Sequence, residues 1–171
     1  MGKSKKIILV LTIIILTFIV IGFWYRAEYS MKAISQEQIH SDRLETKILI
    51  ATQGSDFKRA IVTNIKNHYS LDSVFLKIVD VKELIDINPQ DYDAVVILHT
   101  WEYGNPPSSV KDFIMKNQEY KQKFVVLATS GQGTNRIEGI DALSGESIIV
   151  NASDYSDEII GRIAKIIKSS S

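Results

Sequence analysis

The stretch KILIATQGSDFKRAIVTNIKN, residues 47–67, decides how the rest of the chain is interpreted. Residues 47–51 form a mostly apolar run with two isoleucines, which is typical of a buried strand. A polar turn with one glycine follows at residues 52–56, and the apolar residues after it recur at helical spacing. Ser55 or Asp56 is placed to cap the first helical turn. The stretch therefore predicts a strand, a tight turn and a helix in succession.

A turn that leads from a strand into the N-terminus of a helix is suited to hold an anion. The first amide groups of a helix have no backbone partner, and the helix dipole is positive at that end. Phosphate is the usual ligand of such a site. The same residues also fit an ordinary capped connection, which α/β proteins contain several times, so both interpretations stay open.

An uninterrupted apolar run, IILVLTIIILTFIVIGFW, occupies residues 7–24. Its length is close to the ~20 residues that a membrane-spanning helix needs. It is preceded by lysines and ends at an aromatic pair: Lys3, Lys5, Lys6, Trp24 and Tyr25. A cleavable signal peptide is the alternative, but residues 23–26 lack the small residues of a cleavage site. We therefore predict an anchor over residues 1–26, with a cytoplasmic N-terminus and an extracytoplasmic soluble part.

Composition excludes several classes of function. The formal net charge is zero, so no basic excess is available to neutralise nucleic-acid phosphates. The absence of cysteine excludes disulfides, thiolate metal sites and a cysteine nucleophile. His40, His68 and His99 have no metal-ligand spacing, and His99 is expected at the edge of a site as a structural residue.

The remaining elements follow from the pattern of apolar residues. Residues 27–46 are polar with scattered apolar positions and predict a stalk or linker. Further strands are predicted at residues 73–80, 93–99, 123–129 and 147–150. One helix is expected to begin at Pro106 or Pro107, and a last helix is expected to be capped by Asp154 or Ser156.

Strands that alternate with helices predict an α/β fold with parallel strands and right-handed crossovers. Five strands within residues 47–168 fit a three-layer, doubly wound parallel sheet of order 2-1-3-4-5. Ligands of such sheets bind beyond the carboxyl ends of the strands. This rule brings together the loops at residues 52–56, 100–107 and 130–135.

The second and third loops contain groups suited to a planar ring. Trp101 and Tyr103 offer aromatic faces, and Gly104 lets the backbone bend close to a ligand. The alternative is that Trp101 only covers the edge of the sheet. The third loop, TSGQGTN at residues 129–135, offers backbone amides that suit the edge of a ring and equally suit a surface turn.

These features resemble the flavodoxin-like family over residues 47 to about 167. The resemblance implies noncovalent binding of flavin mononucleotide (FMN), with its phosphate in the first loop. The candidate cofactor-binding residues are Thr52, Gln53, Gly54, Ser55, Lys58, Thr100, Trp101, Tyr103, Gly104, Ser130, Gly131, Gln132 and Gly133. The chain departs from the family pattern in the first loop, which lacks the run T-x-T-G-x-T, and in the acidic residues Asp56 and Glu102. No catalytic residue or metal ligand is predicted.

A shorter stretch, DALSGES at residues 141–147, resembles the segment D-x-x-S/T-G-A-T/S at which some extracytoplasmic proteins receive covalent flavin. It differs from that pattern at Glu146. The alternative for this stretch is a turn that leads into a strand.

Two functions are compatible with these observations. The first is a membrane-anchored flavodoxin-like domain that binds FMN and carries electrons to a redox partner protein, or reduces a small acceptor such as a quinone. The alternative is a flavin-free binding or scaffold module at the membrane, which keeps the fold and uses its loop surface for a partner.

Overall fold

The computed structural model describes residues 2–29, 31–137 and 139–170. The chain divides into two compact units, Met1–Ser30 and Met31–Ser171. The first unit is the helix α1, Lys3–Tyr29, whose large apolar side chains from Ile7 to Trp24 are exposed. Its stretch Lys3–Trp24 is long and apolar enough to cross a membrane, a requirement that a signal sequence also meets.

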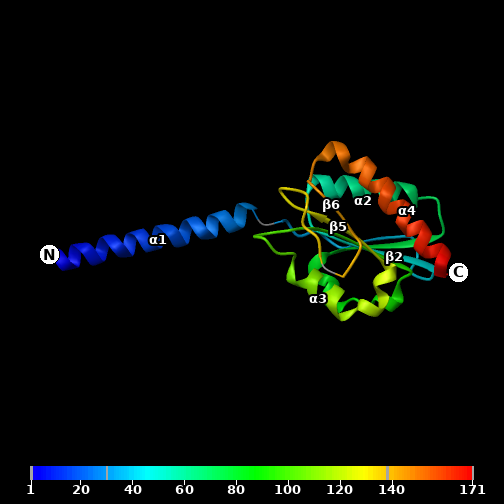
Figure 1. The fold of residues 1–171 in the computed structure, drawn as a ribbon, viewed down its shortest axis with the longest axis horizontal. Coiled ribbons are helices and arrows are strands. Elements are labelled where there is room, and N and C mark those ends of the chain that lie inside the picture. The colour runs from blue at the N-terminus through cyan, green and yellow to red at the C-terminus, as the bar shows by residue number, and fades with distance from the viewer. Residues whose placement is uncertain (1, 30, 138, 171) are drawn as a thin grey trace. The chain divides into compact units, whose positions relative to one another are not determined.

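The second unit is built on a six-stranded sheet of order β1-β3-β2-β4-β5-β6 (Figure 1). The strands are β1 (Glu37–Ile39), β2 (Thr46–Thr52), β3 (Val74–Asp80), β4 (Ala94–Thr100), β5 (Phe124–Thr129) and β6 (Ala142–Gly145). All neighbouring pairs are parallel except β1 with β3. Counted from β2, the parallel strands have the predicted order 2-1-3-4-5, a flavodoxin-like topology.

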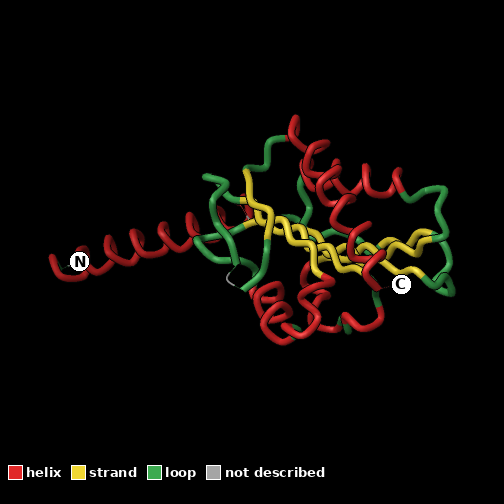
Figure 2. Tube along the Cα trace, turned by 45° about the vertical axis from the view of Figure 1, so that its right-hand side comes forward, coloured by secondary structure: helices red, strands yellow, loops and turns green. Residues whose placement is uncertain are grey.

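Helices cover both faces of the sheet, as Figure 2 shows with helices in red and strands in yellow. The helices are α2 (Asp56–His68), α3 (Ser108–Lys116) and α4 (Ala152–Ser170), with short 3₁₀ turns η1 (Val81–Asp86), η2 (Pro89–Asp91), η3 (Gln118–Lys123) and η4 (Ile149–Asn151). Helices α2 and α4 share one face, and α3 covers the other together with η1.

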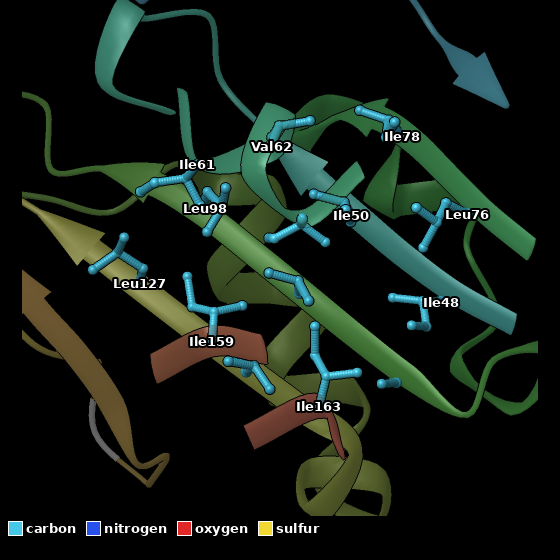
Figure 3. Close-up of a cluster of buried hydrophobic side chains, with 14 of the residues drawn as sticks. Ile48, Ile50, Ile61, Val62, Leu76, Ile78, Leu98, Leu127, Ile159 and Ile163 are labelled. Carbon is cyan, nitrogen blue, oxygen red and sulfur yellow. The ribbon is translucent and has the colours of Figure 1, made fainter. Parts of the chain in front are cut away.

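Side-chain alternation along the strands explains the two apolar layers. In β2, Ile48 and Ile50 face α2 and α4, whereas Leu49 and Ala51 face α3. Figure 3 shows the first layer, in which Ile61 of α2 and Ile159 of α4 point toward the strands. Strands buried on both faces read as continuous apolar runs, which is why the sequence pattern located them.

The last strand lies earlier in the chain than predicted. Residues 142–145 form β6, whereas Ile149 and its neighbours in the predicted strand, residues 147–150, are exposed and lead into the turn η4. A Cβ added at Gly145 would overlap the Tyr155 ring, so glycine allows α4 to pack on this strand. The helix α4 begins at Ala152 rather than after a cap at Asp154 or Ser156, and the Ser156 hydroxyl donates to the Ala152 carbonyl inside the helix.

The predicted stalk, residues 27–46, also differs in the structure. Helix α1 continues to Tyr29, and Glu37–Ile39 add an antiparallel edge strand to β3. Glu37 also forms an ion pair with Lys66 of α2. Because the partners of these residues lie far along the chain, a local pattern carries no signal for this strand.

Candidate functional site

The carboxyl ends of β2, β4 and β5 lie side by side and bring the three predicted loops to one edge of the sheet. Thr52 is in register with Leu98, and Thr100 is in register with Thr129. The loops at residues 52–56, 100–107 and 130–135 begin at these positions. This edge, which we call the carboxyl edge, is the candidate site.

Gln53 joins the first loop to the second. Its side-chain oxygen accepts from the Thr100 amide at 2.6 Å, and its side-chain nitrogen donates to the Glu102 carboxylate at 2.8 Å. Gln53 is buried, whereas Thr100 and Glu102 are half-buried, so both bonds are partly shielded from bulk water. The predicted site residue Gln53 therefore holds the two loops together.

Lys58 extends from the first turn of α2 into the interior and is almost fully buried. Its ammonium group donates to the Thr100 hydroxyl at 2.5 Å, and this hydroxyl lies 2.9 Å from that of Thr129. Thr129 also donates to the His99 carbonyl at 3.2 Å. Burial lowers the pKa of Lys58 to about 8, an effect that the charge of Glu102 opposes. The ammonium group is thus still charged at neutral pH and belongs to a bonded polar network.

The first loop is covered by residues 31–35, which we call the leading segment. The Gly54 amide donates to the Lys32 carbonyl at 2.7 Å, and a Cβ added at Gly54 would lie 2.7 Å from the same oxygen. The Ile34 amide donates to the Asp80 carboxylate at 3.0 Å, and the Met31 amide lies 3.4 Å from the Glu102 carboxylate. Glycine at position 54 is therefore required by the close approach of this segment.

A groove of about 270 Å³ runs between the leading segment and α2. Its lining includes the first loop, Arg59 and Val62. Of the two predicted caps, Ser55 and Asp56, it is Ser55 that caps α2; its hydroxyl accepts from the Lys58 amide at 3.2 Å. Asp56 is exposed and forms an ion pair with Arg59 at 3.2 Å.

On the α3 side of the sheet, buried polar atoms are left without partners. Both ring nitrogens of His99, the indole nitrogen of Trp101 and the hydroxyl of Ser130 have no hydrogen-bond partner among the described residues. The Trp101 amide donates to the Thr129 carbonyl at 2.8 Å, so Trp101 and Ser130 lie side by side just beyond the strands. Burial lowers the pKa of His99 to about 4; the adjacent Thr100 backbone opposes this shift and the charge of Lys58 adds to it, so the ring is neutral at neutral pH.

The tips of the second and third loops are exposed turns. Tyr103 and Gly104 both have positive φ, 52° and 78°, and Tyr103 is 61% exposed. In the third loop, Gly133 has a φ of 66° and packs against Gly145 of β6. Gly131 and Gln132, between Ser130 and Gly133, are exposed. Positive φ favours glycine in both turns.

Sequence reasoning missed three contributors to this edge. These are the leading segment, Asp80 and Thr129. Asp80 and Thr129 each end a buried apolar run, and a polar residue in that position is the signal that could have identified them. The backbone contact of Lys32 with Gly54 has no comparable signature in the sequence.

In this arrangement the Gly54 amide of the first loop is not free to bind the phosphate of FMN. Such a phosphate needs the free amides of the first loop, and the Gly54 amide is already bonded to Lys32. The Glu102 carboxylate, held by Gln53, adds a negative charge beside the same loop. Thr52 turns its hydroxyl to the Gln53 carbonyl at 3.2 Å, so this predicted donor is also occupied.

The stretch that resembles a covalent flavin segment, residues 141–147, has a structural role. Residues 142–145 form the strand β6 and pair with β5. Asp141 forms an ion pair with Arg162 of α4 at 3.2 Å, and the Ser144 carbonyl accepts from the Tyr155 hydroxyl at 3.2 Å. These contacts fix the edge of the sheet against α4.

No protein-family model matches the sequence, and no curated protein matches it. Among solved structures, flavodoxin 2 from Bacillus cereus is 15% identical, with a TM-score of 0.36, over 68% of this chain and 99% of that chain. A putative sugar-phosphate isomerase from Listeria monocytogenes is 12% identical, with a TM-score of 0.34, over 75% of this chain and 69% of that chain. These likenesses are distant and transfer no residue role. The strand order of its own sheet gives the chain a flavodoxin-like α/β fold, preceded by one long apolar helix.

Proposed function

We propose that the chain is a flavin-free binding module, anchored in the membrane by α1, that presents the loops of a flavodoxin-like domain to a partner. One observation supports this proposal above the others: the Gly54 amide of the first loop donates to the Lys32 carbonyl at 2.7 Å. An amide bonded within the chain is not available to a phosphate. The fold is then kept as a scaffold, and its loop surface does the binding.

The anchor sets the compartment in this proposal. The lysines before the apolar run, Lys3, Lys5 and Lys6, keep the N-terminus in the cytoplasm and place the sheet outside it. A reporter enzyme fused after Ser171 is expected to be active only when it folds outside the cytoplasm. Activity of a cytoplasm-only reporter at that position would reverse the orientation.

A titration with FMN tests the absence of flavin. The full chain, purified in nanodiscs, is expected to be colourless and to leave the fluorescence of added FMN unchanged. Riboflavin, which lacks the phosphate, serves as the matched ligand and is expected to give the same flat titration. A yellow preparation, or saturable binding of FMN in preference to riboflavin, would overturn the flavin-free proposal.

The second candidate is the membrane-anchored FMN protein, an electron carrier or a reductase of a small acceptor such as a quinone. The buried donors Trp101 Nε1 and Ser130 Oγ favour it, because they have no partner among the described residues and a ring bound at this edge would supply the acceptors that they lack. In this candidate the leading segment leaves Gly54 before the phosphate binds. Preference for FMN over riboflavin in the same titration supports this candidate and excludes the first.

A further inference from the structure

We infer that the turn formed by Ile148, Ile149 and Val150 rests on the lipid surface of the membrane in which α1 is anchored. The inference depends on the anchor of the proposed function, and it assigns a second, peripheral contact to the sheet unit. The partner is the bilayer interface itself, at the level of the lipid headgroups and the adjoining acyl chains.

These three apolar residues are consecutive in the chain, and all three are exposed. Ile148 is 44% exposed, Ile149 60% and Val150 78%. Single exposed apolar side chains are ordinary on soluble domains and need no explanation. Three in succession, in a turn that leaves a buried strand, mark a surface suited to an apolar partner.

The patch lies at the carboxyl edge, where the chain also enters the sheet unit. Residues 148–150 follow β6, whose last residue, Gly145, accepts from the Ser130 amide of the third loop at 3.1 Å. The first residues of the unit bond to the same edge, Lys32 to Gly54 and Met31 to Glu102. In Figure 1, α4 begins at the end of the sheet that carries these loops and runs toward the other end.

The connection between the anchor and this edge is short. The apolar span ends at Trp24, the helix continues to Tyr29, and Lys32 is already bonded to the first loop. Helical residues rise about 1.5 Å each and extended residues add at most about 3.5 Å each. The covalent chain therefore holds Lys32 within roughly 20 Å of the end of the span. The carboxyl edge is thus confined to the neighbourhood of the bilayer.

Confinement favours the bilayer over a protein partner as the occupant of the patch. A tethered surface meets its own membrane at a high effective concentration, without any diffusional search. Tyr103, 61% exposed at the tip of the second loop, adds an aromatic side chain of the type that accumulates at membrane interfaces. Leu71, in contrast, lies between α2 and β3, near the amino ends of the strands and away from the carboxyl edge. It is 97% exposed.

Because the chain has no cysteine, single-site labelling is specific. The variants Val150→Cys and Leu71→Cys, each carrying an environment-sensitive fluorophore, are placed as full chains in phosphatidylcholine nanodiscs with spin-labelled lipids. We expect the probe at position 150 to be quenched severalfold more than the probe at position 71. Circular dichroism of both labelled variants confirms that they are folded.

The outcomes separate this inference from the proposed function. Equal quenching at the two positions, in protein that co-elutes with nanodiscs, overturns the lipid contact and leaves the anchor in place. Protein that does not co-elute with nanodiscs overturns both. Self-quenching between two labelled copies at position 150, without quenching by lipid, assigns the patch to a second copy of this chain and rejects the bilayer as its occupant.

Discussion

The two sides of the carboxyl edge differ although the same strands supply both. On the side of α2 and α4, Lys58, Thr100 and Thr129 are joined by hydrogen bonds. On the side of α3, His99 and Ser130 keep buried polar atoms without partners among the described residues. Adjacent residues of one strand, such as His99 and Thr100, therefore differ in whether their side chains find hydrogen-bond partners, because their side chains face opposite sides of the sheet.

The covering helices explain this contrast. Helix α2 begins close to the strand ends and directs a long side chain, that of Lys58, onto the threonine hydroxyls. Helix α3 begins only at Ser108 and turns Val110 and Phe113 toward the sheet. Apolar residues cannot bond a histidine ring, so the buried polar atoms of the α3 side stay without partners among the described residues.

The largest expected effect concerns His99. Burial lowers its pKa from 6.5 to about 4. Between these two pH values the unfolded chain binds a proton at His99, whereas the folded chain does not. The contribution of His99 to stability is complete above pH 6.5 and is lost as the pH falls toward about 4. The loss amounts to roughly 3 kcal/mol in the free energy of unfolding.

Urea unfolding of the wild type and of His99→Leu across this pH window measures the effect. The variant is expected to lose stability less steeply, since the carboxylates that titrate in the same window are common to both proteins and cancel in the difference. If the free energy of unfolding fell equally with pH in the two proteins, His99 would be accessible to water, and the contrast between the two sides would be contradicted.

The next effect tests the bonded state of the first loop. Gly54→Ala places a Cβ against the Lys32 carbonyl and is expected to destabilise the protein by about 2 kcal/mol, as overpacking does. Gly161→Ala is the matched control, because no atom lies within 4 Å of its added Cβ and the site is in α4. The control is expected to gain about 0.5–1 kcal/mol from helix propensity. Equal effects in thermal unfolding would mean that the leading segment does not rest on Gly54.

The smallest effect compares one hydroxyl from each side. Thr129→Val removes the partner of Thr100 and is expected to cost about 1 kcal/mol. Ser130→Ala removes a buried hydroxyl that bonds no described residue and is expected to leave stability unchanged or to raise it by up to about 1 kcal/mol. Denaturant unfolding of both variants measures the difference. A larger loss for Ser130→Ala contradicts the assignment of the bonded and unbonded sides.

Local pattern was sufficient wherever burial on both faces made a strand continuously apolar. The runs at residues 47–51 and 93–99 correspond to β2 and β4, and their parallel neighbours follow from the intervening helices. The Ser55 cap was also predictable, because it depends on residues only three positions apart. The meeting of the three loops followed from strand order alone.

The pattern of apolar residues did not locate the two edge strands, because their pairing depends on packing with distant residues. Residues 147–150 have the higher strand propensity, yet Ala142–Gly145 pair with β5 because Gly145 leaves room for Tyr155. The strand Glu37–Ile39 is polar and short, and it exists because β3 offers an unpaired edge. Strand propensity is a property of the residue alone, whereas the pairing of an edge strand depends on the strands and helices that pack beside it.

The long apolar helix, the parallel core strands and their order could be predicted without the structure, because they depend on hydrophobic runs and on short connections. The hydrogen bonds of the candidate site, in contrast, became visible only in the folded chain. The bond from the Gly54 amide to the Lys32 carbonyl, and the burial of the His99 ring nitrogens, depend on backbone positions and covering elements that no local pattern encodes. Hydrogen bonds are made or left unmade by atoms that meet only after folding, so the chemistry of this edge is a property of the folded chain.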